Sequence, residues 1–178
     1  MNNQNVEEVY AENARIRERL KEAVANLNDA EAALALQDGK WCVAEIVEHV
    51  SLVDEKMAAI CSKLLEKAKS AGVAGDGKVV ISEDFAQKIA ELGSVKLEAP
   101  EIVHPTGASI AESLLKMDEN QKVFDRLLPH FASLDGSSHK FPHPYFGELS
   151  AQEWLALRGG HEARHIRQIE KILDEGKK

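Results

Sequence analysis

The stretch "HEARHIRQIEKIL", residues 161–173, places two histidines four positions apart in a segment with helical periodicity. Residues spaced in this way lie on the same face of an α-helix, with their Cβ atoms about 5–6 Å apart. His161 and His165 therefore point in one direction. The same face carries residues suited to a helix packed against a core: Trp154, Leu157, Gln168 and Ile172. Because an imidazole without a partner is costly in such a position, the pair calls for a binding role or a hydrogen-bonding one.

Four long segments of the chain repeat apolar residues every three or four positions, which is typical of amphipathic helices. The segment that holds the two histidines begins at Ser150, a good N-cap with Glu153 three residues later, and runs to about Leu173. The other long helices are expected at about 6–27, 42–68 and 109–131, with shorter ones at 29–36 and 83–92. The sequence shows no pattern typical of β-strands and no internal repeat.

These elements predict an all-α four-helix bundle that spans residues 1–178 as a single domain. The connection at 70–106 is too long for a tight antiparallel turn, so the second and third long helices could run parallel. The order of helix directions would then be up-down-down-up. Periodicity alone leaves that order open.

Composition argues against two classes of partner. The chain has 22 Lys and Arg against 30 Asp and Glu, a net charge of −8, and no basic run that would bind nucleic acid. No stretch approaches the roughly 20 apolar residues of a membrane span, and the N-terminus lacks the apolar core of a signal peptide. Cys42 and Cys61 lie too far apart on one expected helix to form a disulfide with each other. Together these features predict a cytoplasmic protein with reduced thiols.

A third histidine completes a possible metal site. His49 lies in the apolar stripe of the helix at 42–68, beside Ile46 and Val50. Three inward-facing neutral imidazoles from two helices would make a catalytic type of metal site, with coordination positions left open for water or substrate. The plain alternative is that these histidines have no special role.

The letters "HEARH" also match the zinc-protease motif, in which Glu162 would activate a metal-bound water. Such a protease needs a third ligand further along the chain. Only "IRQIEKILDEGKK" follows His165, and it contains no histidine. We therefore interpret the match as a coincidence of a short motif.

Two longer stretches carry a family resemblance. "WCVAEIVEHVSLVDEKM", from Trp41, and "HPYFGELSAQEWLALRGGHEARHIRQIEKI", from His143, together resemble the DinB-like superfamily. This superfamily consists of metal-binding four-helix bundles and includes bacillithiol S-transferases and mycothiol-dependent isomerases. "APEIVHPTGASIAE" is similar to the family as well, so the resemblance covers nearly the whole chain. One departure is Cys42, where the family often has a serine that can cap the helix.

The resemblance implies an up-down-down-up bundle that is often a homodimer. It carries the family's three metal ligands over to His49, His161 and His165, with Ni²⁺ or Zn²⁺ as the divalent ion. It also implies a low-molecular-weight thiol as a cofactor.

The leading functional hypothesis is a metal-dependent thiol S-transferase. The ion would lower the pKa of the thiol, and the thiolate would attack an electrophilic small-molecule substrate. The same ion could instead support hydrolysis. The competing class is a non-catalytic metal-binding or stress-related bundle protein.

Side chains near the three histidines have weaker expected roles. Glu45 and Gln168 could each orient an imidazole from behind, although a glutamate at such a position is more often solvated. Arg164 could attract an anionic substrate or the carboxylate of a thiol. Three rings are expected to pack rather than to bind substrate: Trp41, His143 and Trp154.

Overall fold

The computed structural model describes residues 4–37, 39–93, 95 and 97–176. Its α-helices are α1 (Val6–Val24), α2 (Asp29–Ala32), α3 (Val43–Ala71), α4 (Glu83–Leu92), α5 (Ile110–Ser133) and α6 (Ala151–Gly176). A 3₁₀ turn, η1 (Glu101–Val103), lies in the long connection, and two strands, β1 (Lys140–His143) and β2 (Gly147–Ser150), precede α6.

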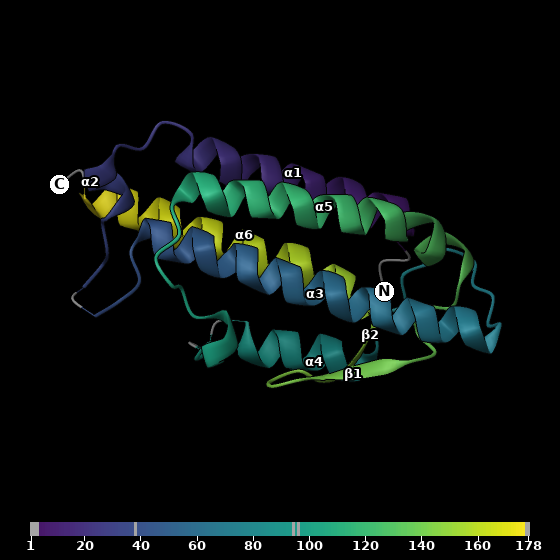
Figure 1. The fold of residues 1–178 in the computed structure, drawn as a ribbon. Helices are drawn as coiled ribbons and strands as arrows, with labels where there is room; N and C mark the ends of the chain where they lie inside the picture. The colour runs from purple at the N-terminus through teal and green to yellow at the C-terminus, as the bar shows by residue number, and fades with distance from the viewer. Residues whose placement is uncertain (1–3, 38, 94, 96, 177–178) are drawn as a thin grey trace.

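The four long helices α1, α3, α5 and α6 form a bundle, and the all-α prediction is confirmed (Figure 1). Helices α1 and α6 run in one direction, and α3 and α5 run in the other. The order is therefore up-down-down-up. The parallel pair α3 and α5 is possible because the connection between them passes through α4 and η1 along the outside of the bundle.

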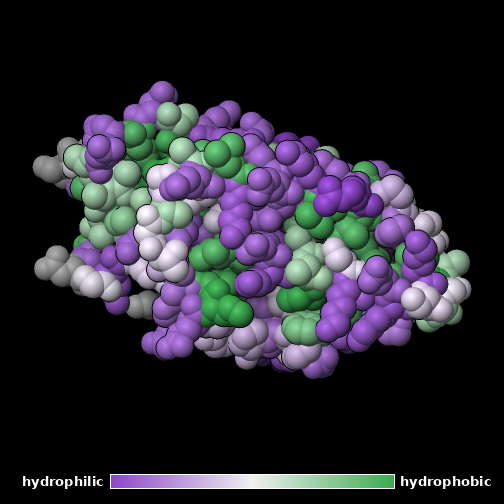
Figure 2. Space-filling view, viewed as in Figure 1, coloured by the Kyte–Doolittle hydropathy of each residue, from purple (hydrophilic) through white to green (hydrophobic). Residues whose placement is uncertain are grey.

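The interior consists of two apolar clusters with a layer of charge between them. One cluster surrounds Phe124 and Leu155, and the other surrounds Ile46 and Ile166. The charged layer between them is made by four buried residues of α1, α3 and α6: Arg17, Asp54, Arg158 and Glu162. The outer face of the bundle that Figure 2 shows is mostly hydrophilic, with smaller hydrophobic patches. Among the described helices, none combines the length and apolar character that a bilayer crossing requires.

Helix boundaries follow local capping. Asn28 and Glu31 form the expected capping box, but α2 ends at Ala32 rather than at 36, and α1 ends at Val24 rather than at 27. Helix α3 begins immediately after Cys42, because the Glu45 carboxylate accepts a hydrogen bond from the Cys42 backbone N–H at 2.7 Å. A carboxylate thus caps a helix whose N-cap residue is a poor cap by itself.

The expectation that the chain has no β-structure was wrong. Strands β1 and β2 pair antiparallel, with Phe141 opposite Leu149. Each strand has only four residues, which is too short for an alternating pattern to stand out from the sequence. Gly147 adopts a positive φ of 78° where the hairpin turns back. Phe146 in the turn packs against Phe85 of α4, so the hairpin and α4 are joined on the outer side of α3.

Two adjacent glycines in α6 are expected to respond oppositely to alanine. A Cβ on Gly159 would lie 2.2 Å from Oδ1 of Asn13, a side chain that donates a hydrogen bond to the Leu155 carbonyl, so Gly159→Ala should destabilise the fold by about 1–3 kcal/mol. A Cβ on Gly160 meets nothing within 4 Å, so Gly160→Ala should stabilise it by up to about 1 kcal/mol. Urea unfolding of the two variants checks the signs. Equal effects would contradict the close approach of α1 to α6.

Candidate metal centre

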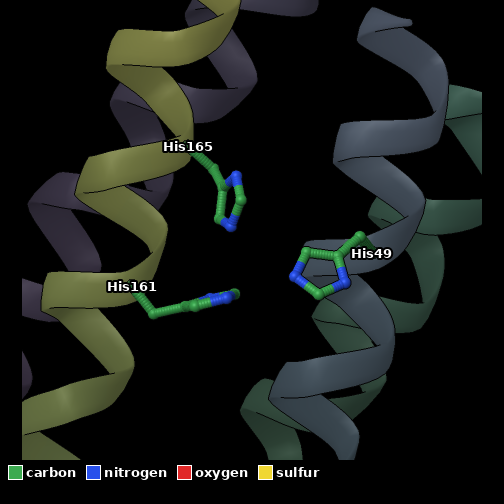
Figure 3. A group of neighbouring side chains, drawn as sticks. All are labelled: His49, His161 and His165. Carbon is green, nitrogen blue, oxygen red and sulfur yellow. The ribbon is translucent and has the colours of Figure 1, made fainter. Parts of the chain in front are cut away.

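Three histidines from two facing helices converge inside the bundle. His161 and His165 lie on consecutive turns of α6 and point toward His49 of α3 (Figure 3). One nitrogen from each ring lies within 4.8 Å of the others. The ring centroids are 4.6 to 5.2 Å apart. The structure therefore brings together the three residues predicted from the sequence.

The environment of the three rings keeps them neutral at pH 7. Burial lowers the pKa of His165 to about 3, and it lowers that of His161 well below the ordinary value for histidine. Burial also lowers the pKa of His49. The proximity of the rings lowers the pKa values further, because each positive charge would repel the next. Neutral imidazoles have a free nitrogen lone pair, which is the form that binds a metal ion.

Two of the rings are fixed from behind by hydrogen bonds. Nδ1 of His49 lies 2.8 Å from the Val103 carbonyl oxygen, and Nδ1 of His165 lies 3.0 Å from Oε1 of Gln168. Because these oxygens can only accept, Nδ1 carries the proton in both rings, and Nε2 has the free lone pair. The expected contact between Gln168 and His165 is present. Glu45 does not have the corresponding role for His49, since its carboxylate caps α3 and the Val103 carbonyl takes that place.

His161 differs from the other two because neither nitrogen of its ring has a hydrogen-bond partner among the described residues. The side chain is only partly buried, so its ring nitrogens are open to a ligand rather than sealed in the core. Nitrogen ligands of one Zn²⁺ ion lie about 3–4 Å apart, because each bond is about 2.0–2.1 Å long. The three-histidine cluster, with its nitrogens within 4.8 Å of one another, is compatible with a divalent metal ion.

Aromatic and charged groups line the surroundings of the cluster. Trp41 packs on the apolar core, as expected. Its ring also contacts His49 in a tilted arrangement, with centroids 4.8 Å apart, and His104 edge to face, with centroids 5.6 Å apart. Arg164 donates a hydrogen bond to the Val95 carbonyl, and its charge contributes to the low pKa of His161 and His165.

His143 packs on aromatic rings, as expected, and its Nδ1 accepts hydrogen bonds from the backbone N–H groups of Tyr145 and Phe146. Burial lowers its pKa to about 4. Between pH 6.5 and 4 the unfolded chain therefore binds a proton that the folded protein does not, and stability falls as pH falls. Lowering the pH from 7 to 5 should cost on the order of 1 kcal/mol through this residue.

The measurement is the free energy of unfolding at both pH values for the wild type and for His143→Asn. The asparagine oxygen can accept the same hydrogen bonds but does not titrate. The variant should therefore lose less stability than the wild type over this interval. An identical loss in both proteins would rule out His143 as the titrating group.

No pattern in the sequence predicted the charged layer, which lies next to the cluster. Arg17 donates to both carboxylate oxygens of Glu162, at 2.6 and 3.0 Å, and also lies 3.2 Å from Asp54. Arg158 donates to the other oxygen of Asp54 at 2.6 Å. Because the carboxylate of Glu162 is directed at Arg17, it is not available to activate a metal-bound water. The zinc-protease match in "HEARH" is thus a coincidence, as inferred.

Comparison with known proteins agrees with this architecture. The family model of the DinB superfamily matches residues 12–169, and the chain belongs to this superfamily. The chain is similar to the uncharacterized protein YuaE of Bacillus subtilis (strain 168), with 27% identity over 138 residues that cover 76% of this chain and 79% of YuaE.

A solved structure confirms the fold. It is described as the crystal structure of TT2238, a four-helix bundle protein, and matches with a TM-score of 0.62. The match covers 93% of this chain and 98% of TT2238, with 20% sequence identity. At this level of identity the similarity establishes the shared bundle.

Proposed function

We propose that His49, His161 and His165 hold a divalent metal ion, Ni²⁺ or Zn²⁺, and that the protein is a metal-dependent thiol S-transferase. The observation that carries the metal site is the convergence of one nitrogen from each of the three rings within 4.8 Å, with the Nδ1 atoms of His49 and His165 held from behind by hydrogen bonds. Membership in the DinB superfamily supports the same function. Three ligands leave coordination positions for a further molecule.

An ion held in this way would supply Lewis acidity, which lowers the pKa of a bound thiol toward neutrality. In the transfer, sulfur forms a bond to the electrophilic carbon while the bond from that carbon to the leaving group breaks. The leaving group departs with the electron pair, and the thiol proton passes to solvent. Arg164 would bind a carboxylate of the thiol or of the electrophile, because its guanidinium lies beside the cluster and forms charge-assisted hydrogen bonds.

The test has two stages on the purified full-length protein. Elemental analysis after reconstitution with Zn²⁺ or Ni²⁺ should give about one ion per chain, and less than about one tenth would overturn the metal site. The metal-loaded protein is then assayed with a panel of low-molecular-weight thiols and a chloronitrobenzene as the electrophile. Metal-dependent thioether formation is the expected result. Bound metal with no transfer for any thiol would favour the non-catalytic bundle protein instead.

A further inference from the structure

Glu48, the residue before His49, is one of the most completely bonded side chains in the protein. It is 2% exposed, and its carboxylate accepts four hydrogen bonds at 2.8 to 2.9 Å. Three come from the backbone N–H groups of Thr106, Gly107 and Ala108, and one comes from the Thr106 hydroxyl. Although burial alone would raise the pKa of Glu48, these hydrogen bonds lower it below its ordinary value.

The segment that Glu48 holds is the segment that orients His49. The Val103 carbonyl, which accepts the Nδ1–H of His49, lies three residues before Thr106, and Val103 is itself buried. Glu48 and His49 are neighbours on α3. The contacts therefore form a closed circuit. It leads from Glu48 through residues 103–106 to the imidazole of His49, the next residue on α3.

We propose that Glu48 is a positioning residue for the metal centre: by anchoring residues 106–108 it places the Val103 carbonyl that fixes the tautomer and orientation of His49. This inference rests on the proposed metal site. Partners behind a metal-binding histidine typically affect metal affinity by about 10–100-fold. Here the partner is the backbone carbonyl of Val103. A side-chain mutation can displace this carbonyl only by changing the residues that hold its loop in place.

The test compares Glu48→Gln with Glu153→Gln. Glu153 is a matched control, since it is 1% exposed and its carboxylate accepts hydrogen bonds from the backbone N–H groups of Ser82 and Ser150. It lies eight residues before His161, about 12 Å along α6. In each variant the new amide nitrogen faces N–H donors that the carboxylate accepted, so both should lose stability.

Titration with Zn²⁺ should show binding about 10-fold weaker in Glu48→Gln and within about twofold of the wild type in Glu153→Gln. Glu48→Asp keeps the charge and should restore part of the loss, which also covers the case in which Glu48→Gln does not fold. A second measurement uses the metal-free protein. Long-range ¹H–¹⁵N correlation spectra should show His49 as the Nδ1–H tautomer in the wild type and in Glu153→Gln, and as a mixture of tautomers in Glu48→Gln.

The outcomes separate this inference from the proposed function. If the wild type binds no metal, the metal site fails and the inference fails with it. If the wild type binds Zn²⁺ and both glutamine variants bind it equally well with His49 unchanged, the metal site stands and the role of Glu48 is overturned.

Discussion

Replacing Arg17 with methionine is expected to lower the free energy of unfolding by about 3–5 kcal/mol. Arg17 is 4% exposed, and the Glu162 carboxylate depends on it for both of its hydrogen bonds. Methionine fills much of the volume but leaves Glu162 as a buried charge without a partner, and the desolvation of that charge is then uncompensated. Denaturation with urea, followed by circular dichroism, measures the loss.

Two further variants test the reason for the effect. Arg15 lies on the same helix and pairs with Glu12 at the surface, where the two side chains are 70% and 51% exposed, so Arg15→Met should change stability by less than about 1 kcal/mol. The double variant Arg17→Met with Glu162→Gln removes both charges and should recover part of the lost stability. If the double variant were as unstable as the sum of the single changes, the unpaired charge would not be the cause.

The second large effect is on metal affinity. His161→Ala should weaken the binding of Zn²⁺ by more than about 100-fold, beyond the range typical of residues that only support a ligand. The helical circular dichroism should be preserved, because the ring of His161 has no hydrogen bond among the described residues whose loss would disturb the fold. Competition with a chromophoric chelator gives the two dissociation constants.

His130→Ala is the control for this experiment. His130 lies in the last turn of α5, outside the three-histidine cluster, and its removal should leave the affinity for Zn²⁺ unchanged. An equal loss in both variants would point to nonspecific binding by surface histidines. Full retention of affinity in His161→Ala would remove this residue from the ligand set.

Much of the site could be predicted from the sequence because it depends on spacing along helices. His161 and His165 are four residues apart and therefore share a helix face, and His49 lies in an apolar stripe, so periodicity predicted that all three face the interior of the bundle. Gln168 is likewise one turn from His165 and contacts it as expected. The helix directions became predictable only when the family resemblance was added to the length of the long connection.

The remaining features depend on contacts between distant parts of the chain. In the sequence, Arg17, Asp54 and Glu162 look like ordinary surface charges, because charged residues are rarely buried unless they are paired. The partners cannot be recognised from the sequence, since Arg17 and Glu162 are 145 positions apart. The Val103 carbonyl has no side-chain signature, so the orientation of His49 could not be read from residue types. Glu48 was missed for the same reason, because its partners are backbone N–H groups.

The charged layer has a consequence for how the helices line up lengthwise. Apolar side chains of similar size would tolerate a slip of α6 along α3 by one turn, about 5.4 Å, with little preference for either alignment. The two guanidinium groups and two carboxylates between the apolar clusters would oppose such a slip, because it would separate the buried ion pairs and leave their charges without partners. We infer that these four charged groups fix the register of α6 along α3, which keeps His49 opposite His161 in the absence of any ligand.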